Sequence, residues 1–227
     1  MSYLQEQLLQ LVGNGNLKFT QSLNPGVENI LGLKVPDVRA LARRIAAAPD
    51  WNVYLDELEH TYMEERMLHG MILGYVKQLP LDVRLQKLHD FIPLINSWSV
   101  CDTVCPTLKF VERNKEEVWH FLVPYFHASG EYAVRFAVVM ALGYYVEDAY
   151  LDRLFILLDE ITHEGYYVKM AVAWLLSVCF VKYPQQTERY LASNRLDAFT
   201  QNKALQKIRE SYRVSPADKE RLKCYKR

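Results

Sequence analysis

Breaks in a helical pattern recur along this chain at similar intervals, and their spacing constrains the fold more than any other feature. Apolar residues recur at helical rather than alternating positions, and no β-branched run bounded by hairpin turns competes. The chain is therefore predicted to be nearly all helix, in helices of about 10 to 17 residues. The first helix is expected at about residues 2–11. Gly, Pro, Asn and His mark the breaks at residues 13–16, 24–26, 35–36, 48–50, 79–80, 127–130, 163–165 and 182–184.

The breaks group the helices into pairs that are delimited near residues 36, 80, 115, 148 and 184. The intervals of about 32 to 44 residues are typical of helical repeats of the HEAT or armadillo kind. The first helix of a pair carries charges on one side, and the second is more apolar. We therefore expect one repeat domain over residues 1–227, with the inner helices lining a concave face. The amphipathic first helices are expected at residues 81–94, 115–126 and 150–161.

Four chemically distinctive residues recur with the repeat on the predicted inner helices. They are Arg66, Asp102, Arg135 and Trp174, at intervals of 36, 33 and 39 residues. Equivalent depth in a stack of repeats makes such residues neighbours. The spacing therefore predicts one site built on consecutive helices.

The segment from Asn96 to Pro106 supplies an aromatic ring and a carboxylate to this site. Asn96 or Ser97 suits a helix N-cap, so Trp98 and Asp102 share one helix face at positions i and i+4. Pro106 cannot donate to the Asp102 carbonyl, which predicts a kink beside the carboxylate. The alternative is that Trp98 only packs and the acid only caps.

Arg135 and Trp174 each stand out from an apolar helix. Arg135 is the one charged residue in 132–146 and needs an anion, which is Glu131 four residues earlier, or Asp102, or a phosphate. Trp174 lies about 120° from the centre of the apolar face of its helix. It either fills a groove between helices or binds a ligand.

The charge is balanced overall but unevenly distributed. The chain has 27 basic and 27 acidic residues. Nine basic and three acidic residues fall in 203–227, so this segment carries +6 and the remainder −6. A basic strip that meets phosphates and a solvated tail both produce this pattern.

Several other classes of protein are disfavoured by the sequence. Four cysteines without a CxxC pair, and six scattered histidines without HExxH, predict no disulfide frame, no metal site and no cofactor. The chain starts without a signal-peptide pattern and has no apolar run of about 18 residues. We expect a cytoplasmic protein without a membrane span. A basic terminal helix that begins with Ser215 as its cap and Pro216 in its first turn gives no reason to expect an assembly beyond a monomer. A hydrolase site at the dipeptide His89-Asp90 would require further inward-facing histidines or carboxylates, and the sequence offers no such set.

Five segments resemble the AlkD-like alkylpurine DNA glycosylases, in order and over nearly the whole chain. These segments are ILGLKVPDVR at 30–39, SWSVCD at 97–102, VRFA at 134–137, AWLL at 173–176 and NKALQKIRESYR at 202–213. The resemblance implies an all-α HEAT-like repeat fold whose concave face holds duplex DNA carrying a cationic alkylated purine. It also implies base excision repair without a protein pocket for the base. Departures from the family are the neutral net charge, Ser99, and the Asn24-Pro25-Gly26 break in a helix that grips DNA.

The resemblance assigns a role to each candidate residue. Asp102 is implied to stabilise an oxocarbenium-like sugar and to position the attacking water, with Trp98 and Trp174 around the lesion. Arg135 is implied to hold a phosphate or to orient the acid. The residues implied to contact DNA are Arg66, Lys203, Lys207, Arg209 and Arg213. The alternative function is a non-catalytic helical-repeat protein that binds nucleic acid or a protein partner.

Overall fold

The computed structural model describes residues 3–13 and 15–227, and all of its regular structure there is helical. The all-α prediction is therefore confirmed. Ser2 and Asn14, which the sequence placed in the first helix and the turn after it, lie outside the described residues. The chain forms two compact units, Met1–Val118 and Trp119–Arg227. One domain over residues 1–227 stays a prediction.

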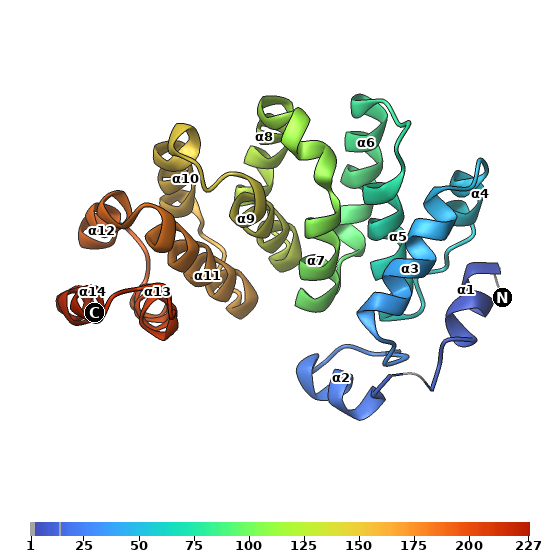
Figure 1. The fold of residues 1–227 in the computed structure, drawn as a ribbon, viewed down its shortest axis with the longest axis horizontal. Helices are drawn as coiled ribbons and strands as arrows, with labels where there is room; N and C mark the ends of the chain where they lie inside the picture. The colour runs from blue at the N-terminus through green and yellow to red at the C-terminus, as the bar shows by residue number, and fades with distance from the viewer. Residues whose placement is uncertain (1–2, 14) are drawn as a thin grey trace. The chain divides into compact units, whose positions relative to one another are not determined.

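The first unit contains two layers of helices. An inner row is formed by α3 (Val35–Ala46), α5 (Met63–Tyr75) and α7 (Trp98–Val104), each packed against the next (Figure 1). The second layer contains α4 (Trp51–Asp56) and α6 (Leu81–Phe91), which pack on α3 and α5. The remaining elements are α1 (Tyr3–Leu9), α2 (Leu17–Leu23), η1 (Ile92–Leu94), η2 (Cys105–Thr107) and η3 (Lys109–Arg113).

The second unit repeats this layering. Its inner row is α9 (Glu131–Tyr144), α11 (Tyr166–Lys182) and α13 (Ala198–Glu210), again packed in succession (Figure 1). The η4 turn (Val123–His127) packs on α9, and α12 (Pro184–Ser193) packs on α11. The other helices are α10 (Asp148–Glu160), α14 (Pro216–Arg221) and η5 (Leu222–Tyr225). Between η3 and η4, α8 (Lys115–Leu122) contains the residue at which the two units divide.

The inner helices are covered on most sides, as expected for helices whose sequences are apolar around most of their circumference. Val134, Phe136, Ala137 and Val138 on α9 are fully buried, and so are Leu175 and Leu176 on α11. Helices covered in this way have apolar residues around most of their circumference. The second helices of the predicted pairs therefore lie inside, as expected.

Several helix boundaries follow from local chemistry. The side chains of Asn16, Ser97, Asp197 and Ser215 accept hydrogen bonds from backbone N–H groups in the first turns of α2, α7, α13 and α14. The prediction of a cap at Ser97 and of Ser215-Pro216 at the start of α14 is thus confirmed. Six of the described α-helices have 6 to 8 residues and are shorter than the predicted 10, namely α1, α2, α4, α7, α8 and α14.

No helix among the described residues combines the length and apolar character needed to cross a membrane.

Candidate functional site

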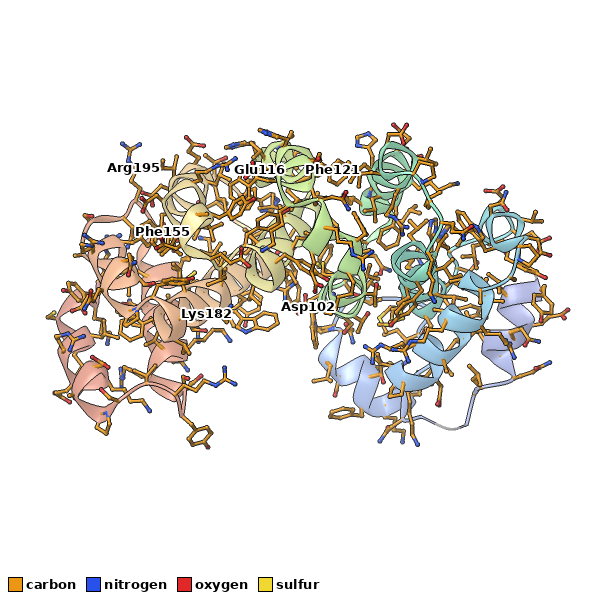
Figure 2. All side chains as sticks on the ribbon, turned by 45° about the horizontal axis from the view of Figure 1, so that its top comes forward. Asp102, Glu116, Phe121, Phe155, Lys182 and Arg195 are labelled. Atoms are coloured by element: carbon orange, nitrogen blue, oxygen red, sulfur yellow. The ribbon has the colours of Figure 1, made fainter. Side chains whose placement is uncertain are left out.

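In the first unit, α7 carries Trp98 and Asp102 one turn apart. Both side chains are half-buried. The indole Nε1 of Trp98 donates to the Leu23 carbonyl at 2.9 Å, which fixes the ring against the end of α2. Asp102 also has an interaction partner, and Figure 2 labels it on α7. The α-helix continues past Asp102 to Val104, and Pro106 lies in the 3₁₀ turn that follows, so the interruption comes after the carboxylate.

An open groove of about 740 Å³ lies beside Trp98 within the first unit. Its walls come from α2, the loop before α3, α5 and α7, and they include Phe19, Leu33 and Met67. Phe19 is 59% exposed, so α2 presents an aromatic ring to solvent at the edge of the groove. The predicted break at Asn24-Pro25-Gly26 falls directly after α2, which leaves this short helix intact. The groove can receive a flat or apolar group next to the indole.

A buried carboxylate that the sequence did not single out shapes the wall of this groove. Glu64 is 1% exposed, and its oxygens accept hydrogen bonds from the backbone N–H groups of Leu31, Gly32 and Leu33 at 2.8 to 3.3 Å. Gly32 has φ +73°, and a Cβ there would lie 2.4 Å from the Leu17 Cα. Glu64 therefore holds a loop that only glycine at position 32 permits. Its position beside Glu65 in the first turn of a predicted inner helix was the available signal.

Arg66 is also on α5, which packs against α7. The side chain is half-buried, and Nη1 donates to the Tyr62 carbonyl at 3.2 Å. Its Nε is buried and has no hydrogen-bond partner among the described residues. Burial lowers the pKa of the guanidinium, although arginine stays charged at neutral pH. Arg66 thus keeps donor capacity in the same unit as Asp102.

In the second unit, Arg135 on α9 connects to the next inner helix. It is 5% exposed, and Nη1 donates to the Tyr167 carbonyl at 2.6 Å. Glu131 accepts a hydrogen bond from the Tyr167 N–H at 2.7 Å. The two side chains therefore fix the first turn of α11 from both the donor and acceptor sides. The observed partner of this guanidinium nitrogen is a backbone carbonyl, which the sequence alternatives did not include.

Trp174 lies on α11 outside the apolar core, as its angular position indicated. The side chain is 37% exposed, in contrast to its neighbours Ala173 and Leu175, which are buried. Tyr167, two turns earlier on α11, stacks on Tyr132 of α9 with ring centroids 5.8 Å apart. The accessible side of α11 thus presents aromatic rings next to the helix that carries Arg135.

The predicted DNA-contacting residues of the C-terminal region lie on and after α13. Lys203 Nζ donates to Gln206 at 3.0 Å and lies 5.9 Å from the centroid of the Phe199 ring. Lys207 is half-buried, whereas Arg209 and Arg213 are exposed. The structure thus brings together Arg66, Trp98 and Asp102 in one unit, and Arg135, Trp174 and the basic residues in the other.

The described residues contain no group of three or more His, Cys, Asp or Glu side chains that could hold a metal ion. The buried thiols of Cys101 and Cys105 lie 4.0 Å apart on the side of α7 away from solvent. No metal chemistry is assigned to this site.

Comparisons with known proteins add the family. A comparison with curated proteins found no match. The model of a protein family described as DNA alkylation repair enzyme matches residues 4–208, which include both groups of candidate residues up to Lys207. That range is well over half of the chain and confirms the resemblance seen in the sequence, including HEAT-like helical repeats as the fold class. The chain belongs to the DNA alkylation repair enzyme family.

Proposed function

We propose that this protein is a DNA glycosylase that releases cationic N3- or N7-alkylated purines from duplex DNA. The observation that carries the proposal is the pairing of Trp98, which lines the open groove, with Asp102 one turn later on α7. Family membership supports a role in DNA repair. The narrower substrate and reaction are those that the sequence resemblance implies, and the chemistry of these side chains suits them.

Asp102 supplies negative charge where the reaction develops positive charge. An alkylated purine already carries a positive charge, so the electron pair of the breaking N-glycosidic bond neutralises the departing base. The sugar becomes oxocarbenium-like, and a carboxylate beside it lowers the barrier most where water is excluded. A water oxygen then bonds to C1′ and gives its proton to Asp102. The products are a free alkylpurine and an abasic site.

The aromatic and basic residues position the nucleotide. Trp98 and Trp174 offer ring faces to the sugar and the cationic base, and a fixed indole loses little entropy on binding. Trp98 meets this condition through its hydrogen bond to Leu23. We propose that two half-sites, Trp98 with Asp102 and Arg135 with Trp174, act on one lesion. Arg135 acts by holding the first turn of α11, and therefore Trp174, in position.

The test measures release of free base from a duplex that contains 7-methylguanine. Asp102→Asn keeps the shape of the side chain and removes its charge, so we expect release to slow by about 100-fold or more. The matched control is Asp90→Asn, which neutralises an exposed carboxylate on α6. The control is expected to react like the parent protein.

Two results would contradict the proposal. Unchanged release by Asp102→Asn would remove the carboxylate from the mechanism. No release by the parent protein, with binding to the duplex intact, would identify a non-catalytic DNA-binding protein of the same fold.

A further inference from the structure

A second groove, of about 480 Å³, lies between α13 and residues 222–226 in the second unit. It is lined by Asn202, Leu205, Gln206, Arg209, Leu222, Lys223 and Lys226. Three of the lining residues are cations and none is a carboxylate. Arg209, Lys223 and Lys226 are all exposed, so their charged groups can reach a ligand.

The two walls of this basic groove are held together by hydrogen bonds. Asn202 on α13 donates to the Arg227 carbonyl at 2.6 Å and accepts from the Arg227 N–H at 3.1 Å. Gln201 donates to the Tyr225 carbonyl at 3.0 Å, and Leu222 is fully buried beneath the groove. Arg227 also donates to the carbonyls of Asn194 and Leu196. The cations are therefore mounted on a fixed frame, which lowers the entropy lost on binding an anion.

The acidic residues near the basic groove are paired with other groups. Glu188 is bound by Arg221 through two nitrogens at 2.8 Å, and Glu210 accepts from Gln206 at 2.7 Å. Glu220 lies 2.6 Å from Lys223 and competes with a ligand there. In the described part of the chain, no hydrogen bond or ion pair involves the side chain of Arg209 or Lys226. These two cations are the strongest anion ligands that the groove offers.

We propose that the basic groove binds phosphate groups of the DNA backbone, through residues other than those proposed for excision. The inference rests on the proposed function. An arginine fork and a lysine on a fixed frame suit phosphate oxygens, and phosphate contacts position a protein on DNA without reading sequence. The family match ends at residue 208, so all three cations lie outside the matched range. The groove adds Lys223 and Lys226 to the residues proposed to contact DNA. It also assigns a backbone phosphate as the partner of Arg209.

The test measures the salt dependence of binding to an undamaged, fluorescently labelled duplex. Each phosphate contact contributes about 0.9 to the slope of log affinity against log salt. We expect the double variant Arg209→Gln with Lys226→Gln to reduce the magnitude of the slope by about 1.8. The matched control is Arg189→Gln with Arg195→Gln, which removes two exposed charges from α12 and the loop after it, with Arg195 labelled in Figure 2. The control is expected to keep the parent slope.

The outcomes separate this inference from the proposed function. If the groove variant binds DNA with the same salt-dependence slope as the parent protein, the proposal for the basic groove is contradicted and the proposed function is not. Loss of binding to phosphatidylserine vesicles with an unchanged DNA slope assigns the groove to a membrane and also overturns it. Release of 7-methylguanine by the parent protein is measured separately, because that result tests the proposed function whatever slope the groove variant shows. Circular dichroism is expected to give the parent melting temperature, because both side chains are exposed.

Discussion

His60 and His69, the latter on α5, form a hydrogen-bonded pair of imidazoles. His60 Nε2 and His69 Nδ1 are 2.8 Å apart, and the ring of His69 also contacts Phe91. His60 has φ +56°, an uncommon backbone conformation for a residue with a side chain. Burial lowers the pKa of His69 to about 3, with smaller effects from His60 and Lys87. The pair is therefore neutral when the protein is folded near pH 7.

This pair is expected to make stability depend on pH. The pKa of His69 is below its unfolded value of about 6.5, so the unfolded state binds the proton first as the pH falls. The contribution of neutral His69 to the stability of the folded protein is complete above about pH 6.5 and declines between about pH 6.5 and 3. At pH 5 the loss from His69 is about 2 kcal/mol. Urea unfolding at pH 7.5 and pH 5 measures this difference.

The variant His69→Gln cannot titrate at this position. We expect the change in stability between pH 7.5 and pH 5 to be about 2 kcal/mol smaller in this variant than in the parent protein. The control is His120→Gln, at an exposed position on α8. A His69→Gln variant that keeps the full pH dependence would show that other groups cause it.

At the scale of elements, one arginine ties the end of α5 to α6. Arg84 is 4% exposed, and its guanidinium donates to the carbonyls of Leu73 and Val76, the latter at 2.6 Å. It also lies 4.8 Å from the centroid of the Phe110 ring. The last carbonyls of a helix lack partners within it and attract positive charge. Arg84 supplies both the donors and the charge.

Replacing Arg84 by Met is expected to destabilise the protein by about 3 kcal/mol, because two carbonyls lose charged donors in a buried place. The stability of Arg84→Lys should fall between those of the parent protein and Arg84→Met, since one ammonium group cannot reproduce the arginine fork. Arg113→Met, an exposed change, is the control and should lie within about 0.5 kcal/mol of the parent. Urea unfolding measures all three. A loss under about 1 kcal/mol for Arg84→Met would contradict the capping role.

These elements show what the sequence could and could not predict. Helix type, the layer of each helix and the caps at Ser97 and Ser215 follow from local patterns, and so does the position of Trp174 outside the core. Glu64, Arg84 and Arg135 form hydrogen bonds with backbone groups 8 to 33 residues away. Backbone groups are the same in every residue, so no pattern of side chains identifies them.

At the scale of the whole molecule, the proposed reaction needs residues from both compact units. Trp98 and Asp102 belong to residues 1–118, and Arg135 and Trp174 belong to residues 119–227. The family match spans the division between the units, which supports one shared task. The basic groove is formed by residues 202–226, which are far from α2 in the sequence. A balanced net charge therefore does not prevent local phosphate binding, because the +6 of residues 203–227 is concentrated there.

A double-mutant cycle with Trp98→Ala and Trp174→Ala tests whether both half-sites act on one lesion. If both indoles hold the same nucleotide in the transition state, their effects on the rate of 7-methylguanine release depend on each other. We expect a coupling energy of about 0.5 to 3 kcal/mol between them. The measurement is single-turnover release by the parent, both single variants and the double variant.

The control cycle pairs Trp98→Ala with Phe199→Ala, an exposed aromatic on α13. Its effects should add within about 0.5 kcal/mol, because Phe199 has no assigned role at the lesion. Additive effects of Trp98 and Trp174 would mean that the indoles serve separate contacts. The excision site would then consist of the α7 residues alone, with the second unit contributing only affinity for DNA.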